Sequence, residues 1–154
     1  MRKILVIGSG KSTSYLIKYL LDKSETENLH ITVGDLNVES AKIMIGNHTN
    51  ASAISLDVFD PISREHAIKA ADIVVSMLPA RFHIEVAKDC ITFNKSMVTA
   101  SYVSDEMQAL DQDAKDKGLV FMNEIGVDPG LDHMSAMQVI DGIRDKGGKI
   151  ILFE

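Results

Sequence analysis

A glycine-rich turn near the amino terminus has residue types and spacing suited to binding phosphate. It follows the apolar run at residues 4–7 and consists of Gly8, Ser9, Gly10, Lys11, Ser12 and Thr13. Glycines between a strand and a helix let the backbone approach a pyrophosphate at the helix amino terminus, as in dinucleotide-binding folds. Thr13 replaces the third glycine of the G-x-G-x-x-G pattern, so a plain strand-to-helix turn remains the alternative. A Walker A loop is excluded, because that motif needs a glycine where this chain has Leu5.

Asp35 is the second residue whose position suits a dinucleotide. It ends the apolar run at residues 29–35, where a carboxylate can accept hydrogen bonds from the ribose of the adenosine half. A 2′-phosphate would be repelled by this carboxylate, and Leu36 and Asn37 offer no arginine to neutralise the charge. We therefore expect the cofactor NAD, with NADP as the other possibility. The alternative role for Asp35 is to cap the helix that begins near Val38.

Two further strand ends are predicted to border the same cofactor. Asp57 and Val58 follow the third apolar run and could lie beside the adenine, although Asp57 could equally hold a turn. Met77, Leu78 and Pro79 follow the fourth run, next to the crevice where parallel sheets bind their ligands. Pro79 could instead serve only to end that strand.

The elements that must position these residues form an alternating pattern of strands and helices. Strands are predicted at residues 3–8, 29–35, 52–57, 73–77, 97–100, 119–122 and 149–153. Helices are predicted at residues 11–23 and at 104–117, the second capped by Ser104 and ended by Gly118. An irregular segment at 123–130 precedes another helical pattern. The fold class is therefore α/β, a doubly wound, mostly parallel sheet of the Rossmann type.

Composition sets the class of protein and excludes several others. The 154 residues suit one domain, and 16 basic against 22 acidic residues give a net charge of −6. This acidic balance, without Lys/Arg clusters, excludes nucleic acid as an expected partner, and the apolar runs are too short to span a membrane. The apolar start is also too short for a signal peptide. A single cysteine, Cys90, fits a reducing compartment, so we expect a cytoplasmic protein.

Four stretches of the sequence resemble one enzyme family. The most specific stretch is residues 123–133, Asn-Glu-Ile-Gly-Val-Asp-Pro-Gly-Leu-Asp-His, and the others are residues 78–83, 99–104 and 147–150. In this order and spacing they resemble saccharopine dehydrogenase of the glutamate-forming type. The resemblance covers nearly the whole chain, which would be the amino-terminal NAD(P)-binding Rossmann domain, residues 1–154. The last predicted strand runs to Glu154 without a turn, so we expect a larger protein to continue there.

The resemblance implies an activity and a set of site residues. Such enzymes oxidise the secondary amine of saccharopine with NAD(P), giving glutamate and 2-aminoadipate 6-semialdehyde in lysine metabolism, or run the reverse reaction. Asp128 and Tyr102 are the expected catalytic and substrate-binding pair, because amine oxidation needs proton transfer and both residues follow strand ends. Ser101 is expected at the cofactor and Arg81 at a substrate carboxylate, with no metal. The second domain, absent from this chain, would bind substrate and form a homodimer, so this chain alone should be inactive.

Structural roles are open for each of these residues. Asp128 could be a helix N-cap before Pro129, and Tyr102 could be a buried hydroxyl that bonds to backbone. His133 could orient Asp128 or be structural, and Glu124 could hold a turn. Arg81 and Lys11 could simply be solvated cations.

Two other functions compete with this reading. Carboxynorspermidine and homospermidine synthases are similar in using the same imine chemistry, and NAD-sensing regulatory domains resemble this chain in length, glycine turn and acidic strand end. The long segment at 123–133 argues against a sensor. Many NADP-using relatives in the resembling family are basic at the position of Asp35, so the cofactor preference is inferred from charge.

Overall fold

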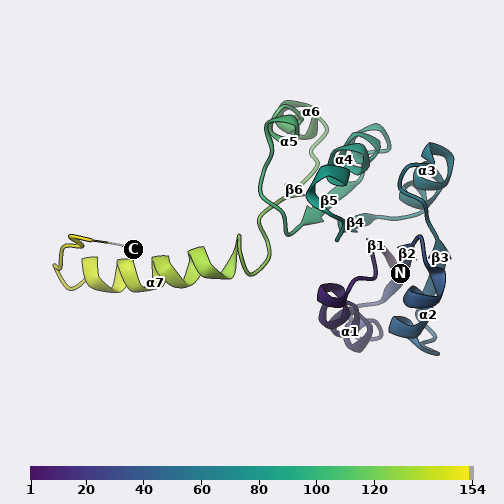
Figure 1. Cartoon of the computed structure of the whole chain (residues 1–154), viewed down its shortest axis with the longest axis horizontal. Helices are drawn as coiled ribbons and strands as arrows, with labels where there is room; N and C mark the ends of the chain where they lie inside the picture. Colours follow the sequence, from purple (N-terminus) through teal and green to yellow (C-terminus); the bar gives the residue numbers. More distant parts are fainter. Residues whose placement is uncertain (153–154) are drawn as a thin grey trace.

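The fold is a single parallel sheet covered by helices on both faces (Figure 1). The structure, a computed structural model, describes residues 1–152. The strands are β1 (Arg2–Ile7), β2 (Leu29–Asp35), β3 (Ala51–Ser55), β4 (Ile73–Ser76), β5 (Ser96–Thr99) and β6 (Phe121–Met122). They lie in the order β3-β2-β1-β4-β5-β6, and every adjacent pair is parallel. The predicted doubly wound α/β class is confirmed.

Alternating side chains of the central strand β1 pack into two separate hydrophobic cores. Val6 packs with the cluster under α1 (Ser14–Lys23) and α2 (Val38–Ile45). Leu5 and Ile7 point the other way, into the cluster under α3 (Pro61–Lys69) and α4 (His83–Thr92). A strand buried on both faces needs apolar residues at consecutive positions, which explains the unbroken apolar run at the start of the chain. The two cores therefore lie on opposite faces of the sheet.

Some helix starts follow local signals in the sequence. The Asp60 side chain accepts hydrogen bonds from the first turn of α3, and Pro61 occupies its first position. The Ser104 side chain accepts a bond from the backbone of Met107, as its predicted cap role requires. The helix predicted at 104–117 is two short helices, α5 (Asp105–Gln108) and α6 (Asp111–Asp116). The helix predicted at 11–23 likewise begins as a short 3-10 turn, η1 (Lys11–Thr13).

The carboxyl-terminal helix α7 (Leu131–Arg144) extends away from the sheet (Figure 1). None of its residues is buried, although Leu131, Met134 and Val139 are apolar. The strand predicted at residues 149–153 is wrong for its described part, because residues 149–152 form no strand. A strand needs a neighbour to pair with, and α7 carries this segment away from the sheet edge; residue 153 lies outside the described residues. Within residues 1–152, no helix is long and apolar enough to cross a membrane.

Candidate functional site

The glycine-rich turn lies at the middle of the sheet, where β1 has β2 on one side and β4 on the other. Gly8 has a φ of +103°, and a Cβ built on it would lie 3.0 Å from the Met77 carbonyl oxygen. Its backbone amide donates to the carbonyl of Gly34 at 2.8 Å. Any side chain at position 8 would therefore clash with β4 and strain the backbone. The first strand is followed by a glycine turn, as the sequence predicted, and its role at a pyrophosphate stays a prediction.

Beyond Gly8 the turn presents helix-start amides on an open surface. A Cβ on Gly10 would meet no atom within 4 Å, and the side chains of Lys11 and Ser12 are exposed. The first amides of a helix lack partners within the helix, so they favour an anion such as a pyrophosphate. Thr13 is fully buried, in the position where the third glycine would pack. Among the described residues, its hydroxyl is the one buried side-chain atom without a hydrogen-bond partner. The turn thus fits the phosphates of a dinucleotide.

Asp35 ends β2 beside this turn and is bonded to it. One carboxylate oxygen accepts hydrogen bonds from the backbone amide and the hydroxyl of Ser9, each at 2.7 Å. The other accepts from the Asn37 amide at 2.8 Å. Burial alone would raise the pKa of Asp35, but these bonds outweigh it and the net pKa is lowered. Asp35 is therefore a fixed carboxylate, and the cap of α2 is Asn37 rather than Asp35.

A cavity of about 190 Å³ lies next to Asp35, between the ends of β1, β2, β3 and β4. Asp35, Asp57, Val58, Leu78 and Pro79 all line it, which places these predicted cofactor residues around one space. Asp57 also holds a turn, because its carboxylate accepts from the backbone amide of Phe59 at 2.9 Å. The predicted residue Met77 is different, since its side chain packs into the core under α1 and α2. Only its backbone reaches the site.

Two aromatic rings that the sequence analysis did not single out form a wall of this cavity. Phe59 and Phe82 line it and contact each other edge to face, with ring centroids 4.9 Å apart. The guanidinium of Arg81 lies 4.6 Å from the centre of the Phe82 ring. The available signal was a phenylalanine two residues after Asp57 and another three residues after Pro79.

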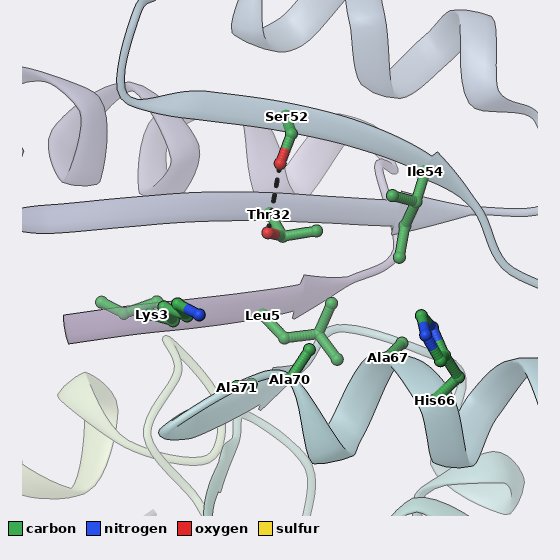
Figure 2. A pocket seen from close by; sticks show the side chains of 10 residues that line it. Lys3, Leu5, Thr32, Ser52, Ile54, His66, Ala67, Ala70 and Ala71 are labelled. Atoms are coloured by element: carbon green, nitrogen blue, oxygen red, sulfur yellow. Dashed lines mark hydrogen bonds between the residues drawn. The ribbon is translucent and has the colours of Figure 1, made fainter. Parts of the chain in front are cut away.

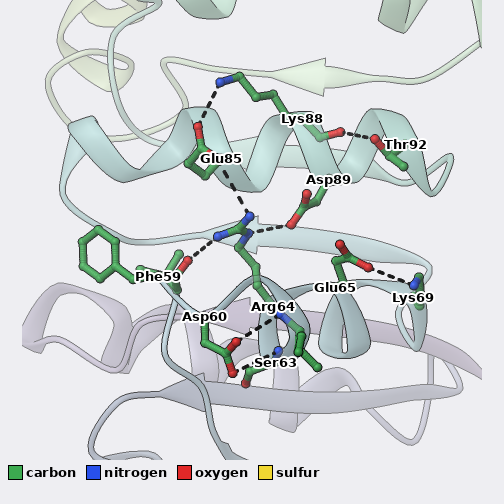
Figure 3. Close-up of polar contacts among 12 residues, drawn as sticks. Phe59, Asp60, Ser63, Arg64, Glu65, Lys69, Glu85, Lys88, Asp89 and Thr92 are labelled. Carbon is green, nitrogen blue, oxygen red and sulfur yellow. Dashed lines mark hydrogen bonds and ion pairs between the residues drawn. The ribbon is translucent and has the colours of Figure 1, made fainter.

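A buried arginine holds the segment that carries Phe59 (Figure 3). Arg64 of α3 donates to the carbonyl of Val58 and forms an ion pair with Asp89 of α4 at 2.5 Å. The side chain of Arg64 is only 7% exposed. One guanidinium therefore fixes the loop at Val58 to α3 and α4. The sequence gives no signal for this role, because burial of Arg64 depends on how α3 and α4 pack.

At the other end of the site, Tyr102 and Asp128 meet. The phenol of Tyr102 donates to a carboxylate oxygen of Asp128 at 2.6 Å. This hydrogen bond raises the pKa of Tyr102, so the phenol stays protonated. Tyr102 is 60% exposed, which rules out the alternative of a buried hydroxyl bonded to backbone. The pair offers a proton donor and a proton acceptor side by side.

The segment that carries Asp128 is a tight loop held by its own backbone. Gly126 and Gly130 pair with each other, and a Cβ on Gly130 would lie 2.3 Å from the Gly126 carbonyl oxygen. The helix N-cap alternative for Asp128 is wrong, because α7 starts at Leu131 with Gly130 as its cap residue. Glu124 has a φ of +61°, and its carboxylate accepts from the Val103 amide at 3.1 Å. It therefore holds the loop next to Tyr102, as its turn-holding alternative requires.

His133 does not orient Asp128. Its ring nitrogen Nδ1 lies 2.9 Å from Asp132, whose carboxylate also accepts from the Gly130 amide. Arg81 lines a cavity of about 150 Å³ together with Tyr102 and Asn123. The structure thus brings Arg81 and Tyr102 to one space. In the described part of the chain, no group of three or more His, Cys, Asp or Glu residues could hold a metal ion.

Sequence comparison now decides the family. The profile of a family described as "Saccharopine dehydrogenase NADP binding domain" matches residues 4–122, which include the glycine-rich turn, Asp35 and Tyr102. The chain belongs to the saccharopine dehydrogenase family.

Individual relatives of this family agree. The chain is 39% identical over 152 residues to the saccharopine dehydrogenase [NADP(+), L-glutamate-forming] of Pyricularia oryzae, covering 99% of this chain and 33% of that protein. It is 40% identical over 132 residues to the alpha-aminoadipic semialdehyde synthase of Arabidopsis thaliana, covering 86% of this chain and 12% of that protein. The chain therefore spans about a third of the length of its saccharopine dehydrogenase relatives, and less of the synthase.

A solved structure of a saccharopine dehydrogenase gives the same result, and a more distant one shares the fold. The apo saccharopine dehydrogenase (L-Glu forming) from Saccharomyces cerevisiae matches with a TM-score of 0.86 at 31% identity, covering 97% of this chain and 33% of that one. Shikimate dehydrogenase from Mycobacterium tuberculosis matches with a TM-score of 0.59 at 20% identity, covering 80% of this chain and 46% of that one, which shows the shared fold alone. The chain is thus a nucleotide-binding Rossmann domain of the saccharopine dehydrogenase family.

A second cavity is separate from the glycine-rich turn and from Asp35 (Figure 2). It has a volume of about 190 Å³ and lies between α3 and the middle of β1, β2 and β3. Leu5 and Ala67 form its floor, and the hydroxyls of Thr32 and Ser52 lie 3.3 Å apart at its edge. It contains none of the predicted cofactor or catalytic residues.

Proposed function

We propose that this chain is the dinucleotide-binding domain of an enzyme that oxidises saccharopine to glutamate and 2-aminoadipate 6-semialdehyde in lysine metabolism, or catalyses the reverse. The observation that carries the proposal is the Tyr102–Asp128 pair, which lies at the carboxyl edge of a family-matched dinucleotide fold. The relatives named for this reaction support it.

The reaction removes a hydride and a proton from a secondary amine. A bound nicotinamide would accept the hydride from the substrate carbon. The Asp128 carboxylate, already an acceptor for the Tyr102 phenol at 2.6 Å, would take the proton from the amine nitrogen. That proton would pass to solvent, and the freed carboxylate would then take a proton from the water that adds to the imine carbon. Tyr102 would orient the carboxylate, and Asp128 would give the proton from the water to the nitrogen of the leaving amine as the carbon–nitrogen bond breaks.

The substrate carboxylates need cations. Arg81 is exposed, and it lines a cavity with Tyr102, so it is placed to pair with one carboxylate of saccharopine. We propose that the remaining contacts come from a second domain, which would bind substrate and make the full-length protein a homodimer. Under this proposal the present chain binds nucleotide but turns over no substrate.

The coenzyme is a nicotinamide dinucleotide, and we propose that NAD is preferred. The family and several relatives are named for NADP. In this chain, however, the carboxylates of Asp35 and Asp57 border the cavity next to the glycine-rich turn. Asp35 is ionised and held in place by Ser9 and Asn37, so a 2′-phosphate beside it would meet a fixed negative charge.

The charge proposal is tested by Asp35→Asn. This change keeps the shape and removes the charge, so the ratio of NAD to NADP affinity should fall about tenfold, as expected for one unscreened charge contact. Asp113→Asn, an exposed change on α6, is the control and should leave the ratio unaltered. A wild-type preference for NADP would refute the role given to Asp35.

The enzymatic proposal needs the full-length protein. Saccharopine with NAD or NADP should give reduced nucleotide together with glutamate. Turnover of carboxynorspermidine or homospermidine instead of saccharopine would reassign the substrate within the same imine chemistry. Nucleotide binding without turnover of any of these amines would favour a sensor.

A further inference from the structure

A buried histidine connects the two strand ends beneath the catalytic half of the site. His83 is the first residue of α4 and is 4% exposed. Its Nδ1 lies 2.8 Å from the Ser76 hydroxyl, while its Nε2 lies 2.8 Å from the Ser101 hydroxyl and 3.1 Å from that of Thr99. Both ring nitrogens are therefore bonded to hydroxyl groups.

These hydroxyls come from the carboxyl edge where the cofactor is expected. Ser76 ends β4 and Thr99 ends β5, and the two residues are direct partners in the register of the strands. Ser101 lies two residues beyond Thr99 and directly before Tyr102. The ring of His83 also lines the cavity that Arg81 and Tyr102 share. His83 thus joins the sheet edge to the backbone that carries the catalytic phenol.

The protonation state of His83 decides which of its hydroxyl partners donate hydrogen bonds and which accept them. Burial lowers the pKa of His83, so the ring is neutral, with one donor nitrogen and one acceptor nitrogen. When Nε2 carries the hydrogen, it donates to Ser101 and Thr99, and the hydroxyl of Ser101 keeps its own hydrogen free for another acceptor. Ser101 is only partly buried, so that acceptor can be a ligand.

We propose that His83 is a positioning residue of the nucleotide site, which directs the Ser101 hydroxyl as a donor toward the carboxamide of the nicotinamide half. The proposal rests on the proposed function, because it assumes that a dinucleotide lies along this edge. An amide oxygen is a strong acceptor, and a fixed hydroxyl lowers the entropy cost of binding it.

Two variants of His83 test its hydrogen bonds to Ser76 and to Ser101 separately. His83→Gln places an amide near the position of Nε2 and keeps a partner for Ser101. His83→Asn is shorter, so it keeps the Ser76 contact and loses the one to Ser101. The ligands are NAD and ADP-ribose, because ADP-ribose lacks the nicotinamide but retains the adenosine and both phosphates.

We expect a large loss of affinity only for His83→Asn and only for NAD. His83→Asn should bind NAD about tenfold more weakly and His83→Gln within about threefold of the wild type, the cost of one hydrogen bond. ADP-ribose affinity should stay within about twofold in both. Equal loss of NAD and ADP-ribose, or unchanged NAD binding in His83→Asn, would overturn the proposal.

Ser101→Ala covers the case in which neither His83 variant folds. It removes only the proposed donor, so NAD affinity should again fall about tenfold while ADP-ribose affinity is kept. Unchanged NAD binding in this variant would also refute the role of His83. Failure of the wild-type chain to bind either nucleotide would instead refute the proposed function.

Discussion

The two halves of the site are built in opposite ways. On the adenosine side, Asp35 accepts three hydrogen bonds and the buried Arg64 holds the wall of a defined cavity. On the catalytic side, Tyr102 is 60% exposed and Asp128 lies on an exposed loop that leads into an unburied helix. Packing of this chain therefore fixes the side chains of the proposed cofactor half, whereas the Tyr102–Asp128 pair of the proposed catalytic half is exposed. The sheet core and the catalytic pair should respond independently to mutation.

The largest effect is expected from Asp128→Asn, which should lower turnover and leave NAD affinity unchanged. Asp128→Asn in the full-length protein should lower turnover by about 10²- to 10⁴-fold, the usual value of a positioned acid–base group. NAD affinity and the free energy of unfolding should be unchanged, because the carboxylate is exposed. Turnover and calorimetric binding measured on the same variant check this. An equal loss of binding would show that the two halves are coupled.

Next in size is the buried ion pair on the adenosine side. Arg64→Ala leaves Asp89 without its partner and frees the Val58 carbonyl, so the free energy of unfolding should fall by about 3 kcal/mol. Lys18→Ala, which breaks an exposed pair with Asp22, should cost less than about 0.5 kcal/mol. Urea denaturation of both variants measures the difference. Similar losses would mean that Arg64 does not hold the wall.

A smaller effect should appear in the pH dependence of stability. Burial lowers the pKa of folded His83 below the ordinary value of 6.5, so the unfolded chain binds the proton more readily. Its contribution is present above pH 6.5 and is lost as the pH falls from there toward the lowered folded pKa. His83→Gln should flatten this part of the profile, followed as thermal midpoint against pH. An unchanged slope would show that another group titrates there.

The smallest effect is expected at α7. Val139→Gln exchanges an exposed apolar side chain, 63% accessible, so stability should change by no more than about 0.5 kcal/mol. Ile68→Ala, in the fully buried core under α3, should cost about 2–5 kcal/mol in the same assay. Comparable losses would mean that α7 contributes to the core of this chain.

The sequence predicted correctly those features that depend on neighbouring residues, such as turns, strand ends and helix caps. The turn at Gly8, the strand end at Asp35 and the Ser104 cap were predicted correctly, because a turn, a strand end and a helix start are encoded by neighbouring residues. The roles of Gly8 and Asp35 at a dinucleotide stay predictions. The strand expected at 149–153 was wrong, since pairing depends on where α7 leads the chain.

The missed site residues depend on packing between distant elements. The sequence analysis gave no role to Arg64, an arginine on a short helix, and packing of α3 against α4 buries it. His83 gains its three partners from the ends of two strands, β4 and β5, which no spacing in the sequence reveals. Pairing of Tyr102 with Asp128 was anticipated only through the family resemblance.

One titration tests the contrast between the two halves most directly. The 154-residue chain is titrated with NAD by calorimetry, first alone and then with saturating saccharopine. The organised cofactor half predicts one NAD bound per chain, with an affinity that saccharopine does not alter. Absence of NAD binding would contradict a cofactor half organised by this chain, and an affinity that shifts with saccharopine would contradict the independence of the two halves.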